Sequence, residues 1–348
     1  MKILVSIEHP AWAYQYKFII KELQKRGHRV EVLAINKDMD LELLENFGIS
    51  FNKIANTTGK NRCEKACLLL LTTWRAFLFC LKYKPDLFLG NASPLMAINA
   101  FIFHKKYLVF EDTENNIESL FLCKLFATNI ITPTSFKSNL GPKQIRVKTY
   151  KEIAYLHPKY FTPNPSILAD LNLKEGQIFT IARFVSWDAS HDMGYKGFNN
   201  EEKVNLVNVL KKYGPVFISS EASLPEELKQ YEYDLSRTKM HDLLYYATLL
   251  FTEGRTMASE AAILGTHSVY YNVATEGYTT EQEEKYQLVS NFKLGQTEPK
   301  EAINKCKELI ETKDLWKIGK EKRKKLLDEQ IDLNEYILNL VDKMLGHA

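Results

Sequence analysis

The pattern that most constrains the fold is a regular alternation of short apolar runs with helical segments. Each apolar run is rich in branched residues and is bounded by turn residues; in the first half these runs are residues 2–7, 29–35, 50–54, 86–89, 106–110 and 130–132. Between the runs, apolar residues recur every three or four positions, as in residues 13–27, where Gly27 stands at the position of a C-cap. The other helical segments are residues 41–47, 66–81 and 93–103. This alternation predicts an α/β fold with a parallel sheet covered by helices on both faces.

The alternation stops in the middle of the chain and then starts again. Residues 154–165, AYLHPKYFTPNP, hold three prolines and no clean period, which is typical of a linker. Further strands are predicted at residues 178–184, 216–219, 249–252 and 267–271, and further helices at residues 200–213, 241–247 and 257–264. From residue 281 onward the sequence is mostly helical, and we expect one long charged helix over residues 315–345.

A length of 348 residues suits two domains of this kind. We predict an N-terminal Rossmann-like domain of residues 1–155 and a C-terminal Rossmann-like domain of residues 166–325. The last helical part, residues 326–348, would pack back on the first domain. Two doubly wound domains in series would face each other across a cleft that lies at the carboxyl ends of their strands.

Composition argues against a nucleic-acid-binding protein, a cysteine metal site and a disulfide-rich secreted protein. A net charge of +3 gives no reason to expect a nucleic-acid partner, and the five cysteines form no Cys-x-x-Cys pair, so neither a metal site nor disulfides are expected. Reduced thiols and an N-terminus without a secretory pattern favour a cytoplasmic protein.

The longest apolar stretch, residues 66–81, is broken by Thr72, Thr73 and Arg75, and it is short for a membrane span. We expect it to be a buried helix of the first domain. The alternative is a peripheral face that touches the inner side of the membrane, with Lys65, Arg75 and Lys82 near the lipid headgroups.

The strongest functional pattern is LLFTEGRTMASEAAILGTHSVYYN, residues 249–272. A strand runs through a glycine-containing turn into a helix that carries Thr256 and Ser259 near its start. The open N–H groups and the positive dipole end of such a helix bind anions, and both hydroxyls can donate to phosphate oxygens. Glu260 could accept hydrogen bonds from ribose hydroxyls. The alternative is ordinary helix capping, because Thr, Ser and Glu are common in first turns.

This strand, turn and S-E-A-A-x-L-G helix resemble the nucleotide-sugar segment of glycosyltransferases of the B-type (GT-B) fold. They are also similar to the matching segment of non-hydrolysing UDP-N-acetylglucosamine 2-epimerases. The resemblance implies that Glu260 contacts ribose and that Arg255, Thr256 and Ser259 contact the diphosphate.

Most of the chain also resembles one uncharacterised prokaryotic family of that superfamily. The landmarks are IEHPAW (7–12), FEDTE (110–114), KEIAYLHPKYF (151–161), RFVSWDASHD (183–192) and TMASEAAILG (256–265). This resemblance implies the GT-B fold more strongly than it implies a reaction.

A second pattern is RFVSWDASHDMGYKG, residues 183–197, which follows the first strand of the second domain. A loop so rich in charged and aromatic groups is a candidate site. We expect Arg183, Trp187, Asp188 and Lys196 to bind the nucleotide sugar, with Trp187 stacked on a base or sugar ring, and His191 to act in catalysis. The epimerases carry a His/Arg-rich loop at this point, but their exact motif is absent. The alternative is a solvated loop with one buried Trp.

Three strand ends supply further candidates. His9 follows the first strand, where an imidazole can act as general base, although it could equally cap the next helix. Asp112 and Glu114 belong to a carboxylate cluster, residues 111–114, in which like charges should raise at least one pKa; the alternative is an acidic helix cap. Glu221 ends a strand of the second domain and should line the nucleotide-sugar site. No G-x-G-x-x-G or Walker motif is present, which argues against NAD, FAD and P-loop chemistry.

The sequence therefore predicts a glycosyltransferase that needs no metal and no cofactor. Its second domain would hold a nucleoside diphosphate sugar, with UDP as the expected nucleotide, and its first would present a glycan or lipid-linked acceptor to His9 or Asp112. Arg255, the helix N-terminus and Lys196 would stabilise the leaving diphosphate. The alternatives are an isomerase or hydrolase like the UDP-sugar 2-epimerases, in which the acidic cluster moves the C2 proton, and a non-catalytic nucleotide-sugar-binding protein.

Overall fold

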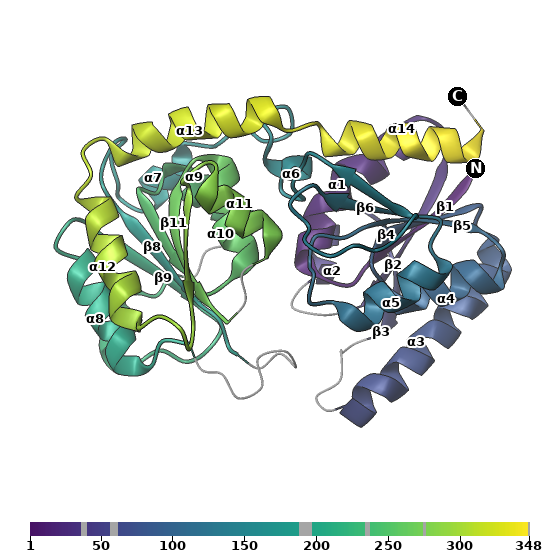
Figure 1. Cartoon of the computed structure of the whole chain (residues 1–348), viewed down its shortest axis with the longest axis horizontal. Helices are drawn as coiled ribbons and strands as arrows, with labels where there is room; N and C mark the ends of the chain where they lie inside the picture. Colours follow the sequence, from purple (N-terminus) through teal and green to yellow (C-terminus); the bar gives the residue numbers. More distant parts are fainter. Residues whose placement is uncertain (36–39, 56–61, 188–196, 234–236, 274–275, 347–348) are drawn as a thin grey trace. The chain divides into compact units, whose positions relative to one another are not determined.

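The computed structural model describes residues 1–35, 40–55, 62–187, 197–233, 237–273 and 276–346, and the chain forms two compact units. Unit 1 comprises Met1–Tyr155 and Ile331–Ala348, and unit 2 comprises Leu156–Gln330. Figure 1 shows a parallel sheet with helices on both faces in each of them.

Unit 1 is built on a seven-stranded sheet with the order β3-β2-β1-β4-β5-β6-β7, in which every strand pair is parallel. Its strands are β1 (Lys2–Ile7), β2 (Arg29–Ile35), β3 (Asn52–Ala55), β4 (Leu87–Asn91), β5 (Lys106–Phe110), β6 (Asn129–Pro133) and β7 (Gln144–Val147). Its helices are α1 (Pro10–Lys25), α2 (Asp40–Asn46), α3 (Arg62–Tyr83), α4 (Pro94–Ile102), α5 (Ile117–Phe126), α6 (Ile153–Leu156, which ends at the unit boundary) and α14 (Leu333–Leu345). Helix α1 packs against both α2 and α14, and α4 packs between α3 and α5.

Unit 2 has a five-stranded parallel sheet with the order β12-β11-β10-β8-β9. Its strands are β8 (Thr180–Phe184), β9 (Val216–Ser220), β10 (Leu249–Thr252), β11 (His267–Asn272) and β12 (Val289–Lys293). Its helices are α7 (Ser166–Asp170), α8 (Asn200–Leu210), α9 (Met240–Tyr246), α10 (Arg255–Leu264), α11 (Gly277–Glu284), α12 (Pro299–Ile310) and α13 (Leu315–Glu329), with short 3-10 turns at Glu226–Tyr231 and Arg237–Lys239. Helices α9, α11 and α13 pack around α10, and α8 packs against α12.

The strand orders decide where a ligand can bind in each unit. In unit 1 the chain reverses its direction across the sheet between β1 and β4, and in unit 2 it does so between β8 and β10. The loops that leave two such strands diverge to opposite faces of the sheet, and this opens a crevice at their carboxyl ends. The crevice of unit 1 therefore follows Ile7 and Asn91, and that of unit 2 follows Phe184 and Thr252.

Two helix predictions were wrong. The single helix expected over residues 315–345 is two helices, because Gln330 is extended and the Ile331 N–H donates to the Lys148 carbonyl oxygen (2.9 Å). Asp332 then caps α14 by accepting a hydrogen bond from the Glu335 N–H.

The helix expected to be buried, residues 66–81, is the largely exposed helix α3. Only 22% of the window Ala66–Tyr83 is buried, and Leu70 and Trp74 are 73% and 57% exposed. Helix α5 and strands β7 and β12 were not predicted at all.

Candidate functional site

The crevice of unit 2 brings together the two segments that the sequence singled out. The loop after β8 begins at Val185, and the turn after β10 begins at Glu253. These strands are hydrogen-bonded neighbours, with Thr252 opposite Arg183, so both segments leave the same edge of the sheet. Residues 188–196, which include the candidates Asp188, His191 and Lys196, lie outside the described residues.

The buried carboxylate of Glu253 ties these segments together. It accepts hydrogen bonds from the Val185 N–H (3.0 Å), the Trp187 Nε1–H (3.1 Å) and the Phe198 N–H (2.7 Å). Burial raises the pKa of Glu253, and these donors act in the opposite direction. Gly197 lies so close that a Cβ there would stand 2.0 Å from Glu253 Oε1, so this close approach requires glycine at position 197. Glu253 therefore joins Val185 and Trp187 to Phe198 through its hydrogen bonds, and it was not among the predicted site residues.

The start of helix α10 has the features of an anion site. Gly254 occupies the N-cap and has no side chain with which to cap the helix. The Gly254 N–H donates a hydrogen bond to Thr252 Oγ1 (2.9 Å). Thr256 is half-buried in the first turn, where the N–H groups and the dipole of the helix favour negative charge. Arg255 lies beside it and pairs with the buried carboxylate of Glu276 (2.5 Å).

The next two candidates on α10 lie deeper. Ser259 is fully buried, and its Oγ accepts a hydrogen bond from Gln282 Nε2 (2.8 Å). Glu260 is nearly buried, and its Oε1 lies 3.0 Å from His241 Nε2 on α9. Both side chains thus have protein partners, and the pairing with His241 was not visible in the sequence because the two residues come from different helices.

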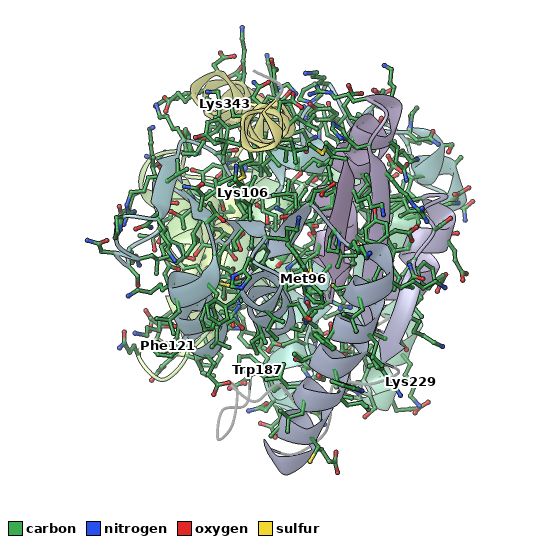
Figure 2. All side chains as sticks on the ribbon, turned by 90° about the vertical axis from the view of Figure 1, so that its right-hand side faces the viewer. Met96, Lys106, Phe121, Trp187, Lys229 and Lys343 are labelled. Atoms are coloured by element: carbon green, nitrogen blue, oxygen red, sulfur yellow. The ribbon has the colours of Figure 1, made fainter. Side chains whose placement is uncertain are left out.

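Arg183 and Glu221, at the ends of neighbouring strands, form an ion pair. Arg183 Nη1 also donates to Ser219 Oγ (2.6 Å), and the Ser186 N–H donates to Glu221 Oε2 (3.2 Å). Trp187, labelled in Figure 2, has a left-handed backbone with φ of 58° and is half-buried. The structure therefore gathers Arg183, Trp187 and Glu221 at the same edge as α10.

In unit 1, His9 lies where the crevice opens after β1. It is the N-cap residue of α1, and its Nδ1 accepts a hydrogen bond from the Ala11 N–H (3.2 Å). The capping role that the sequence left as an alternative is therefore present. A general-base role would fall to Nε2.

The carboxylates after β5 lie against a buried lysine. Lys151 Nζ donates to Asp112 Oδ2 (2.9 Å) and lies 3.7 Å from Glu152 Oε1, and all three side chains are at most 6% exposed. Glu111 Oε1 accepts hydrogen bonds from the Asp112 and Thr113 N–H groups. Burial, reinforced by the charge of Asp112, raises the pKa of Glu111 to about 7. Neither Lys151 nor Glu152 was predicted, although both stand in the landmark KEIAYLHPKYF.

Glu114, the other candidate of this cluster, is placed differently. It is half-buried, and its Oε1 accepts a hydrogen bond from the Lys137 N–H (2.9 Å). The carboxylates of the cluster are therefore not equivalent, and the buried members are Glu111 and Asp112.

Several buried polar atoms on β1, α1 and β4 have no protein partner in the part of the chain that the structure describes. They are Ser6 Oγ, Tyr16 Oη, and both side-chain polar atoms of Gln15 and Asn91. Ser6 lies on β1 and Asn91 ends β4, the two strands that flank the crevice of unit 1. Burial is the largest cause of the raised pKa of Tyr16, and the negative charges of Glu111 and Asp112 raise it further. The Tyr16 hydroxyl therefore lies close enough to interact electrostatically with these two carboxylates. Unpaired polar atoms are costly to bury, which marks this region as a place where a polar ligand can bind.

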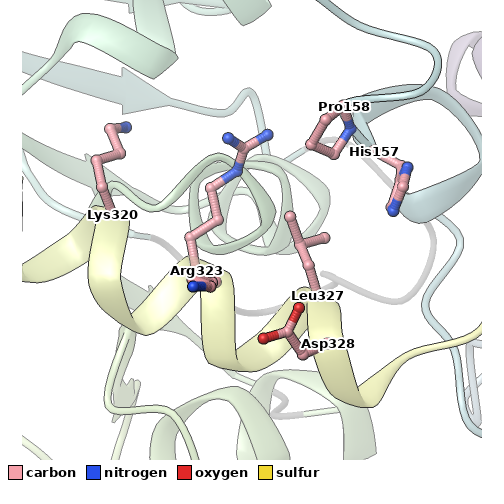
Figure 3. A pocket seen from close by; sticks show the side chains of 7 residues that line it. His157, Pro158, Lys320, Arg323, Leu327 and Asp328 are labelled. Atoms are coloured by element: carbon pink, nitrogen blue, oxygen red, sulfur yellow. The ribbon is translucent and has the colours of Figure 1, made fainter.

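Unit 2 also has a cavity of about 310 Å³ at the other end of α10 (Figure 3). Its lining includes His157, Lys320, Arg323 and Asp328. Arg323 Nε and Lys320 Nζ donate to the Ile263 and Leu264 carbonyl oxygens, which end α10. This cavity is therefore separate from the helix start that faces the crevice. Among the described residues, no group of three or more His, Cys, Asp or Glu side chains is placed to hold a metal ion.

No protein-family model matches the sequence, and no curated protein matches it. Solved structures are nevertheless similar in fold over the whole chain. UDP-GlcNAc 2-epimerase from Methanocaldococcus jannaschii matches with a TM-score of 0.70 and 16% identity, covering 99% of this chain and 100% of its own. UDP-GlcNAc 2-epimerase from Neisseria meningitidis, bound to UDP-GlcNAc, matches with a TM-score of 0.66 and 15% identity, covering all of both chains.

The glycosyltransferase VinC, in complex with dTDP, matches with a TM-score of 0.63 and 14% identity, covering 99% of this chain and 100% of its own. At these identities the likeness concerns the fold. The prediction of an α/β chain with two Rossmann-like domains of the GT-B type is confirmed.

Proposed function

We propose that this chain is a glycosyltransferase of the GT-B type that transfers a sugar from a nucleoside diphosphate sugar, with UDP as the expected nucleotide. The observation that carries the proposal is the crevice of unit 2, where the start of α10, with Gly254 as its N-cap residue, and residues 185–187, bonded to Glu253, meet at one sheet edge. A diphosphate is the ligand that suits such a helix start. Solved structures of the same fold with UDP-GlcNAc and with dTDP support this choice of ligand.

Different residues of unit 2 would then bind the diphosphate, the ribose and a ring of the ligand. The first-turn N–H groups of α10 and the Thr256 hydroxyl would bind the diphosphate, and Arg255, held by Glu276, would add positive charge. The Glu260–His241 pair would contact the ribose, and Trp187 would stack on a ring of the ligand. As the bond between the anomeric carbon and the phosphate oxygen breaks, these groups would stabilise the negative charge on the leaving diphosphate. No part of this scheme requires a metal.

Unit 1 would hold the acceptor, a glycan or lipid-linked alcohol, near Glu111, Asp112 and His9. The acceptor oxygen would bond to the anomeric carbon and give its proton to a base. Glu111 suits that role because a pKa of about 7 leaves it able to accept a proton at neutral pH.

The raised pKa of the buried Glu111 carboxyl also favours a second candidate, a 2-epimerase acting on a UDP-sugar. A buried carboxyl with a raised pKa can also remove and return a proton at a sugar carbon. UDP-N-acetylglucosamine in deuterated water separates the two candidates. An epimerase incorporates deuterium at C2 with no acceptor present, whereas a transferase leaves the sugar unlabelled and releases UDP only when an acceptor is added. A protein that binds the ligand and does neither would be a non-catalytic binder.

Thr256→Ala tests the nucleotide site directly. The change removes one hydroxyl that would donate to a phosphate oxygen, and a hydrogen bond to a charged group contributes about 1.5–3 kcal/mol. We expect the affinity for UDP, measured by isothermal titration calorimetry, to fall roughly 10- to 100-fold. Thr312→Ala, at the end of α12, removes a hydroxyl that bonds only locally to Glu308, and should bind like the unchanged protein. Equal affinity of all three proteins would contradict this placement of the diphosphate.

A further inference from the structure

Helix α3 has an apolar stripe on each of two opposite sides. Its inner stripe, Thr72, Ala76, Cys80 and Tyr83, is buried against unit 1. Its outer stripe, Leu70, Trp74, Leu78 and Leu81, has the same spacing and is 48–73% exposed. Positions 72 and 74 point about 200° apart on a helix, so the outer stripe lies opposite the packed one. An amphipathic surface helix would carry polar residues there.

Helices α4 and α5 continue this apolar surface. Phe101 and Ile102 end α4, and Ile117, Phe121 and Leu125 form one exposed stripe along α5 (Figure 2 labels Phe121). Aromatic rings join the three helices. The Phe77 ring of α3 stacks on Trp74 and contacts the ring of Phe103, which follows α4. The ring centroids of Phe101 on α4 and Phe126 on α5 are 4.5 Å apart. Of the 15 large hydrophobic side chains that are exposed in the described chain, 11 lie on these helices. We call this set the outer apolar surface: Leu69, Leu70, Leu71, Trp74, Leu78, Leu81, Phe101, Ile102, Ile117, Phe121 and Leu125.

The charges around the outer apolar surface have one predominant sign. Helices α3, α4 and α5 together hold five Lys and Arg against two acidic residues, a net charge of +3, which equals the net charge of the whole 348-residue chain. Within the apolar window of α3 the only charged residues are Arg75 and Lys82, seven positions apart along one border of the outer stripe. A second copy of this chain docked face to face would bring two such positive borders together, which is unfavourable. An anionic lipid surface offers both hydrocarbon and the opposite charge.

Helix α3 is long and apolar enough to cross a bilayer, but its inner stripe is part of the core of unit 1. The Tyr83 hydroxyl donates to the Arg29 carbonyl oxygen (2.6 Å), which fixes the last turn to the sheet. The first turns extend past α4 and α5 in Figure 1. We therefore propose that the outer apolar surface docks unit 1 on an anionic membrane, with α3 lying in the interface and Arg75 and Lys82 at the headgroups.

This docking would be independent of the proposed reaction, but it has a consequence for the acceptor. Helix α5 begins at Ile117, directly after the carboxylate loop at the carboxyl edge of the sheet. The membrane would then lie beside the residues proposed to receive the acceptor. This consequence rests on the proposed function and favours a lipid-linked acceptor over a soluble glycan.

Vesicle binding of the full chain tests the proposal. We expect co-sedimentation with vesicles of phosphatidylcholine and phosphatidylglycerol and much weaker binding to phosphatidylcholine alone. The triple variant Leu70→Gln, Trp74→Gln and Leu78→Gln changes only exposed side chains and should lose at least tenfold in binding, with the affinity for UDP unchanged. The double variant Arg75→Gln and Lys82→Gln should lose roughly fivefold for each charge on anionic vesicles.

A fluorescent label gives a site-specific readout. Cys67 is exposed and lies seven positions before Trp74, so it shares the outer stripe, whereas Cys80, Cys123 and Cys306 are buried. In a Cys63→Ser background, an environment-sensitive dye on Cys67 should shift to the blue with anionic vesicles. A dye on Glu308→Cys of α12, in a background that also carries Cys67→Ser, should not shift. Binding that survives the triple variant, absence of binding to both vesicle types, or a dimer that this variant makes monomeric would each overturn the proposal, the last in favour of a second copy.

Discussion

Glu111→Gln should change the stability of unit 1 in a pH-dependent way. In the folded chain, burial and then the charge of Asp112 raise the Glu111 pKa from 4.5 to about 7. A carboxyl whose folded pKa is raised binds its proton more tightly when folded. Its contribution to stability is therefore complete below pH 4.5 and is lost as pH rises to about 7. A shift of that size corresponds to about 3 kcal/mol, which wild-type protein loses between these pH values.

Glutamine keeps the shape of the side chain and cannot ionise. Its Oε1 can still accept hydrogen bonds from the Asp112 and Thr113 N–H groups. The variant should melt at the same temperature as wild type near pH 5. At pH 8 it should melt higher by up to about 6–12 °C, since 1 kcal/mol corresponds to about 2–4 °C for a unit of this size.

Scanning calorimetry of the full chain at pH 5, 6, 7 and 8 gives the measurement. Glu118→Gln, an exposed carboxylate on α5, provides the matched control and should leave the melting temperature unchanged at every pH. A difference between Glu111→Gln and wild type that is the same at pH 5 and pH 8, or a lower melting temperature at pH 8, would refute the reasoning.

Three other substitutions test buried contacts in the two units. Lys151→Met should cost unit 1 about 3–5 kcal/mol, because it leaves buried carboxylates without their cation; denaturant unfolding measures this, and a loss below 1 kcal/mol would contradict a buried ion pair. Gly197→Ala should displace Glu253 and weaken UDP binding at least tenfold in calorimetry, and unchanged binding would show that the loop is not needed. Gly319→Ala should destabilise unit 2 by about 1–3 kcal/mol in thermal unfolding, since its Cβ would lie 2.1 Å from the Gly265 carbonyl oxygen; a neutral effect would mean that α13 can move away easily.

The strand framework was predictable because a buried parallel strand is an apolar run with turn residues at its ends. Strands β1, β2, β5 and β10 match the runs expected for them. Helix α5 escaped prediction because apolar residues occupy both its inner positions, Leu120 and Cys123, and its outer stripe. A helix that is apolar all round has no hydrophobic period to detect. Helix α3 was detected, but the same property led to the wrong expectation that it was buried.

The break between α13 and α14 and most of the site pairings depend on contacts between distant segments. Ile331 leaves the helix because it pairs with Lys148, far away in the sequence. Lys151 and Asp112 are 39 residues apart and meet only when the sheet and its connections are formed. By contrast, the start of α10 could be located from sequence, because a strand, a glycine turn and a helix are consecutive there.

The two crevices differ in how their polar groups are hydrogen-bonded, and this difference supports the separate roles proposed for them. In unit 2, Glu253 already has three donors, and Glu260 and Ser259 have side-chain partners, so the crevice is preformed and can receive a ligand through the start of α10. In unit 1, Tyr16 and Asn91 bury polar atoms that have no protein partner among the described residues. Each such atom costs about 1–3 kcal/mol unless a ligand or water pairs with it. A chain that keeps this cost beside a carboxyl of raised pKa retains groups that suit a reacting hydroxyl or sugar carbon. This is why the proposed function gives the chemical step to unit 1 and nucleotide binding to unit 2.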